Sequence, residues 1–238
     1  LMKMRKLFAG IAAAATLLGG MALGATSAQA DDAAGTPVTG VATFTFTAET
    51  AEQLTNANLK AYKIGDYVQY GSGENVAYGV VTNSNNKTAV DSALKAAGVD
   101  TTDSEVDHLA AALNAGTLDI SATRPWDKTA NGNASTTRAF ANALESEGKL
   151  ASGQKVTLGA ATTVQGGYSA SVNLPAGIYV FIDSAAATES VTKAIPMIVA
   201  SGTVNTGKKA LTDPIQGANT VNMKNTNNPG KTKEVNNQ

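Results

Sequence analysis

The chain has 238 residues, a formal net charge of −1 and no cysteine. A chain of this length can bury a sizeable core, and the lack of cysteine excludes disulfide bonds and thiol catalysis. The balance of 18 basic and 19 acidic residues disfavours nucleic-acid binding, which needs a strongly basic surface.

Residues 1–30 have the pattern of a secretory signal peptide. Basic residues stand near the start, an apolar stretch covers 7–25, and Ala28 and Ala30 are the small residues that a signal peptidase reads. We therefore predict export and cleavage after Ala30, in preference to a retained membrane anchor. The exported part would carry 15 basic and 19 acidic residues, a net charge of about −4 with histidine neutral, and no further membrane span is expected in it.

The first part of the exported chain shows the period of β-strands. Ala42, Phe44 and Phe46 alternate with threonines, which predicts a strand with one buried face. Extended segments are also predicted over 59–64 and 67–70, with a break at Gly65-Asp66, and over 76–80.

The period becomes helical in the middle of the chain. Apolar residues recur at helical spacing in three segments, which predict helices over 90–97, 106–113 and 135–147. Gly98 and Gly148 are suited to end the first and third helices. Thr102 to Glu105 resembles a capping box, so we expect the second helix to begin there.

Strands resume in the last third. The residues from Tyr168 to Leu174 alternate, and 178–182 is an unbroken apolar run that predicts a strand buried on both faces. Leu174 to Gly177 reads as a tight turn, so these two strands are expected to pair at the centre of a β-sandwich. Shorter strands are predicted over 155–158, 195–199 and 220–224, and Thr203-Val204 could extend one.

No residue pattern points to catalysis or to a cofactor. His108 is the only histidine, and Asp107 cannot orient it because neighbouring helical residues do not face each other, so we interpret His108 as a helix-surface residue. One histidine without cysteine cannot build the usual zinc site, and no calcium or phosphate loop is present. Trp126, the single tryptophan, either covers the core edge or stacks on a sugar.

Two segments, LPAGIYVFID (174–183) and IPMIVASG (195–202), resemble the end of the first domain in Gram-positive fimbrial backbone pilins of the actinobacterial type. The resemblance covers the layout of the exported chain, and it is specific only at these strands, the segment after them and the export signal. It implies a mainly β fold: an Ig-like β-sandwich over residues 31–225 with a helical insertion at about 87–147. Residues 226–238 would then be a linker to an absent second domain.

Subunits of that family are joined covalently when a lysine attacks an acyl group held by a sortase. The family motif V-x-x-Y-P-K-N has a degenerate counterpart in Val221-Asn222-Met223-Lys224-Asn225, which lacks Tyr-Pro and is two residues shorter. The resemblance makes Lys224 the first choice, with Lys231 and Lys233 beyond Pro229-Gly230 as alternatives. The other interpretation is that all three are solvated linker lysines.

Pilin domains of this kind also hold internal Lys–Asn or Lys–Asp isopeptide bonds in some members. By that resemblance Lys60, on an early strand, and Asn222, on the last one, form the pair to be tested. The bond requires a desolvated site in which the amine is neutral.

The resemblance implies a structural subunit of a fimbrium at the cell wall, not an enzyme. Its partners would be other pilin subunits, a sortase, and a host glycan or matrix protein. The alternative is a secreted carbohydrate- or host-binding adhesin that does not polymerise, which exposed aromatic residues lining a groove would favour. An LPxTG-type sorting signal is missing from the sequence, so we expect a fragment of a longer subunit.

Overall fold

The computed structural model describes residues 35–71, 73–121, 135–185, 193–205, 210–216 and 219–224. The predicted signal peptide with its cleavage after Ala30, Trp126, Lys231, Lys233 and the predicted linker lie outside these residues. Within the described residues the fold is mainly β, with its sheets consistent with a β-sandwich.

The described strands form two larger sheets and a small ribbon. The first sheet has the order β1-β3-β8-β9, with β4 and β5 also paired to β3, and the second has the order β12-β2-β7-β6. The first sheet contains β1 (Thr36–Pro37), β3 (Leu59–Tyr70), β4 (Ala77–Thr82), β5 (Gln154–Lys155), β8 (Ile178–Asp183) and β9 (Met197–Ala200). The second contains β2 (Val41–Ala48), β6 (Thr162–Val164), β7 (Gly167–Pro175) and β12 (Asn219–Asn222), and the ribbon pairs β10 (Val204–Asn205) with β11 (Ala210–Leu211).

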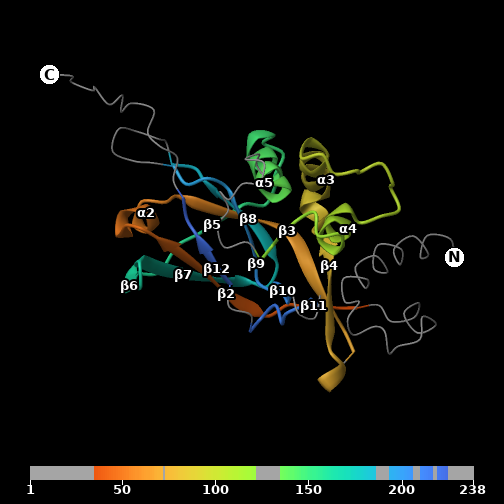
Figure 1. The fold of residues 1–238 in the computed structure, drawn as a ribbon, viewed down its shortest axis with the longest axis horizontal. Helices are drawn as coiled ribbons and strands as arrows, with labels where there is room; N and C mark the ends of the chain where they lie inside the picture. Colours follow the sequence, from red (N-terminus) through yellow and green to blue (C-terminus); the bar gives the residue numbers. More distant parts are fainter. Residues whose placement is uncertain are drawn as a thin grey trace.

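Helices lie on the face of the first sheet that is turned away from the second sheet (Figure 1). The covering helices α3 (Lys87–Ala96), α4 (His108–Asn114) and α5 (Thr136–Ser146) come between β4 and β5 in the chain. The short helix α2 (Ala51–Thr55) follows β2, and single 3-10 turns occupy Gly73–Asn75 and Ser84–Asn86. The molecule is therefore layered as sheet, sheet and helices.

Strand β8 lies between the two cores of the protein, as its unbroken apolar run predicts. Ile178 and Val180 pack into the core beneath the helices, whereas Tyr179 and Phe181 point between the two sheets. Because successive strand residues point to opposite faces, a strand covered on both sides needs apolar residues at every position. The burial of β8 confirms that prediction.

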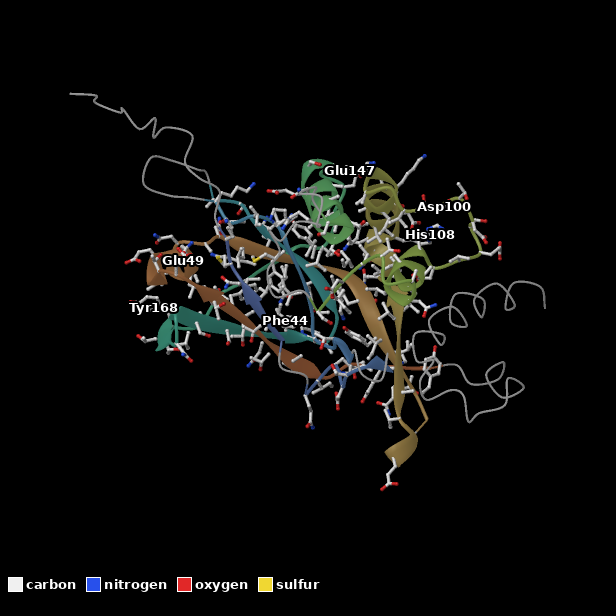
Figure 2. All side chains as sticks on the ribbon, in the orientation of Figure 1. Phe44, Glu49, Asp100, His108, Glu147 and Tyr168 are labelled. Atoms are coloured by element: carbon white, nitrogen blue, oxygen red, sulfur yellow. The ribbon has the colours of Figure 1, made fainter. Side chains whose placement is uncertain are left out.

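The core between the sheets contains an aromatic cluster. The Phe44 ring centroid lies 5.3 Å from that of Tyr179, edge to face, and the Phe46 centroid lies 5.0 Å from that of Phe181. Phe44 and Phe46 are fully buried on alternate positions of β2, as predicted, and Figure 2 shows Phe44 among the side chains between the sheets. Edge-to-face pairs of this kind add to the stability that apolar burial supplies.

The helical segments confirm two predicted boundaries and correct a third. Gly98 and Gly148 follow α3 and α5 with positive φ angles of 85° and 62°. The second helix does not begin at Thr102 to Glu105: its N-cap is Asp107, whose side chain accepts from the Ala110 amide at 2.9 Å. Asp103 instead makes a local turn in which its carboxylate accepts from the Glu105 amide.

The predicted break at Gly65-Asp66 is wrong, because β3 runs unbroken from Leu59 to Tyr70. The pairing with β8 shifts register between Lys63 and Gly65. A Cβ atom at Gly65 would lie only 3.1 Å from Leu109 Cδ2 and 3.2 Å from Ile178. This glycine therefore permits close approach of α4 and β8, and it does not end the strand.

The turn from Leu174 to Gly177 does not close a hairpin. Strand β7 pairs with β2 and β6, whereas β8 pairs with β3 and β9, so the turn carries the chain from one sheet to the other. The Ala176 amide donates to the Gly40 carbonyl at 2.8 Å, and the Gly177 amide donates to Ser201 Oγ at 2.9 Å. These bonds to two different elements fix the crossover.

Candidate functional site

The site built around Lys224 begins with the last described strand. Strand β12 pairs in parallel with β2, with Asn222 opposite Thr47. Val221 and Met223 are 1% and 2% exposed and pack into the core between the sheets. Because strand residues alternate, Lys224 points away from the core into which its neighbour Met223 packs. The strand predicted over 220–224 is present as β12, which ends at Asn222.

Lys224 is exposed, and hydrogen bonds fix the backbone just before and just after its Cα atom. The preceding amide, that of Met223, donates to the Thr47 carbonyl at 2.7 Å, and the Lys224 carbonyl accepts from the Ile195 amide at 2.9 Å. A lysine in this setting combines solvent access with a defined origin for its long side chain. That combination suits an amine that must be presented to another molecule.

The segment that holds Lys224 is itself bound to buried polar side chains. Asp183 is 1% exposed, and its Oδ2 atom accepts from the Ala194 amide at 2.8 Å. Its Oδ1 atom accepts from the amides of Asn58 at 3.0 Å and Ala185 at 2.9 Å. All three donors are backbone groups, so Asp183 joins the segment at Ala194 to the end of the β3–β8 pairing, where Leu59 lies opposite Asp183.

Helix α5 holds the same segment from the other side. Arg138 is 8% exposed, and its Nη2 atom donates to the Pro196 carbonyl at 2.5 Å and to Asn142 Oδ1 at 3.0 Å. Burial lowers the pKa of Arg138 to about 10, although the charge of Glu145 acts in the opposite direction. The group therefore remains charged near neutral pH. Two helical turns further on, Glu145 accepts a hydrogen bond from Lys193.

The predicted internal pair, Lys60 and Asn222, is not brought together. Lys60 is exposed on β3 of the first sheet, and Asn222 lies on β12 of the second. The neighbours of both residues, including Ala61 and Val221, point into the core between the sheets. Alternation then turns both side chains outward, on opposite faces of the sandwich, so neither the contact nor the desolvation that the bond needs is present.

The interpretation of His108 as a surface residue is wrong. Its side chain is 6% exposed, Nδ1 lies 2.8 Å from Asp91 Oδ1, and Nε2 lies 2.8 Å from the Asp103 carbonyl oxygen. Asp107 does not orient it, as expected, because that carboxylate accepts from the Thr82 amide and hydroxyl. Figure 2 shows His108 on the helical side of the molecule. With both ring nitrogens engaged, His108 is placed to join α3 to α4, and it is poorly placed to act as a general base.

Among the described residues, no group of three or more His, Asp or Glu side chains is arranged to hold a metal ion. In the same part of the chain no helix is long and apolar enough to cross a membrane. No family model matches the chain, and no match was found among curated proteins or solved structures.

The sequence named Lys224 as a candidate, but it did not point to Asp183 or Arg138. Asp183 directly follows the apolar run of β8, where a charged residue reads as a strand end exposed to water. Arg138 lies three residues before Ala141 on the buried face of α5. This helical spacing could have indicated that Arg138 is buried. Asp183 bonds the Asn58 amide 125 positions away, and Arg138 bonds the Pro196 carbonyl 58 positions away, and no local pattern reveals contacts at such separations.

Proposed function

We propose that this chain is the N-terminal part of a fimbrial backbone subunit that a sortase joins covalently to its neighbours through Lys224. The observation that carries the proposal is the setting of Lys224: an exposed lysine that directly follows buried Met223, two residues after the end of β12. The Met223 amide is bonded to Thr47, and the Lys224 carbonyl is bonded to Ile195. Its ε-amine, once deprotonated, attacks the thioester carbon of an acyl-sortase, forms an amide and expels the cysteine thiolate.

The proposal includes the finer architecture that the family resemblance implies. The layered sheets support an Ig-like β-sandwich, and α3, α4 and α5 correspond to a helical insertion over about 87–147. The subunit would be exported by its signal peptide and reside in a fimbrium at the cell wall, with a linker leading to a second domain. Its partners would be further subunits, the sortase and a host glycan or matrix protein.

We further propose that the chain is not itself an enzyme. The activated acyl group belongs to the sortase, so the subunit has to supply an amine at a fixed place. The engagement of both nitrogens of His108 supports this, because the sole histidine is already used in holding helices together.

Replacing Lys224 with arginine in the full-length subunit tests the proposal. Arginine keeps the charge and most of the stem, but its guanidinium stays protonated and does not attack the thioester. When the subunit is expressed with its sortase, Lys224→Arg should abolish the ladder of covalent polymers and leave a folded monomer. Lys231→Arg and Lys233→Arg serve as matched controls and should keep the ladder. A ladder that persists in Lys224→Arg would contradict the assignment.

A further inference from the structure

The segment 194–196 connects two buried charged residues to Lys224 through one hydrogen bond at each consecutive position. The Ala194 amide donates to Asp183, the Ile195 amide donates to the Lys224 carbonyl, and the Pro196 carbonyl accepts from Arg138. Proline has no amide hydrogen, so every amide donor of this segment is committed in this way. The bond to Lys224 lies between the two others.

Both anchors are buried more deeply than charged residues usually are. Asp183 is 1% exposed and Arg138 is 8% exposed. Burying charged groups is costly unless they are fully hydrogen-bonded, and here their partners include backbone groups of a segment that borders Lys224. The arrangement holds the segment against β8 on one side and against α5 on the other.

We propose that Asp183 and Arg138 are positioning residues that fix Lys224 for attack on an incoming acyl group. This inference rests on the proposed role of Lys224. Neither residue touches the reacting atoms: they hold Ala194 and Pro196, and the Ile195 amide between these residues holds the Lys224 backbone. If the segment is loosened, the Lys224 backbone is no longer held in one position. The ε-amine then reaches the acyl group in fewer of the encounters with the sortase.

Asp183→Asn is a selective test because the two carboxylate oxygens accept from different amides: Oδ1 from Asn58 and Ala185, and Oδ2 from Ala194. The amide oxygen of asparagine can keep the bonds from Asn58 and Ala185, but its NH2 group would then face the Ala194 amide, where two donors repel. Arg138→Met removes the donor to Pro196 while keeping much of the apolar stem. Arg138→Lys keeps the charge without the planar fork, and it is the milder variant if Arg138→Met does not fold.

The experiment uses the full chain as the acyl acceptor for a pilus-type sortase, with a peptide carrying an LPxTG sorting signal as the donor. Asp183→Asn and Arg138→Met should lower kcat about tenfold or more and leave KM for the chain within about twofold, because docking is kept and only alignment is lost. Arg138→Lys should recover part of the rate. Leu113→Ala, a core change in α4, should unfold more easily but keep kcat at a temperature where it is folded.

Amide hydrogen exchange provides a readout that does not depend on the sortase. Exchange at Ile195 should become at least about tenfold faster in both variants, whereas exchange at Met223, which is bonded to Thr47, should hardly change. Folded variants with unchanged kcat, or with Ile195 still protected, would overturn the assignment of positioning residues. Transfer that survives Lys224→Arg would instead contradict the proposed function, and with it the role assigned here.

Discussion

Asp91 Oδ1 lies 2.8 Å from Nδ1 of His108, and this contact joins α3 to α4. A second bond from Nε2 to the Asp103 carbonyl holds the loop between the two helices. The carbonyl can only accept, so Nε2 is the donor in that bond. One buried imidazole thus links three segments of the helical layer.

Replacing His108 with glutamine should destabilise the fold by about 1–3 kcal/mol, because buried partners lose hydrogen bonds that one amide cannot replace. Urea unfolding followed by circular dichroism measures this. Lys87→Ala is the matched control, since it removes an exposed partner of the same Asp91 and should cost at most about 0.5 kcal/mol. Equal effects of the two changes would argue against a structural role for His108.

Alkaline pH should unfold the protein through Tyr67. Burial raises the pKa of this phenol, and the hydrogen bond with Gly202 offsets the effect only in part. The unfolded tyrosine ionises near its ordinary pKa of 10, so stability is fully present below that pH and falls as the pH rises further.

Tyrosine absorbance and circular dichroism, recorded together during a base titration, measure this effect. Part of the phenol signal should appear only as the protein unfolds, and Tyr67→Phe should weaken the loss of stability at high pH. If all tyrosines ionised near their ordinary pKa while the fold stayed intact, the result would contradict the burial of Tyr67.

Two adjacent glycines should respond very differently to alanine. A Cβ at Gly167 would lie 2.2 Å from the Ala48 carbonyl oxygen, whereas one at Gly166 would have nothing within 4 Å. Both have positive φ angles, so Gly166→Ala should cost about 1–2 kcal/mol for its backbone conformation alone. Gly167→Ala should cost clearly more, because β7 has to move away from the end of β2. Thermal unfolding of the two variants tests the difference, and equal melting temperatures would contradict it.

Local patterns were sufficient for some elements and insufficient for their arrangement. The alternation of Phe44 and Phe46 and the apolar run of β8 are local, so burial of those strands could be predicted from the sequence. The pairing of β8 with β3 instead of β7 joins residues more than a hundred positions apart, and a turn sequence does not determine which sheet follows it. For the same reason Lys224 could be named from a motif, whereas the hydrogen bonds of Asp183 to Ala194 and of Arg138 to Pro196 could not be predicted.

The fold should need neither metal nor disulfide bonds. Addition of a chelator or a thiol reductant is expected to leave the melting temperature of the protein unchanged, since the sequence has no cysteine and packing between the layers supplies the stability. Differential scanning calorimetry in the presence of each reagent measures this. A substantial drop with the chelator would reveal a structural metal.

The most direct test of the role of Lys224 is to identify the covalent link in assembled polymers. Polymers formed when the full-length subunit is expressed with its sortase can be digested with a protease, and any branched peptides can be sequenced by tandem mass spectrometry. The proposal predicts an isopeptide bond between the Lys224 ε-amine and the C-terminal acyl group of a neighbouring subunit. A branch at Lys231, Lys233 or any other lysine, with Lys224 unmodified, would contradict it.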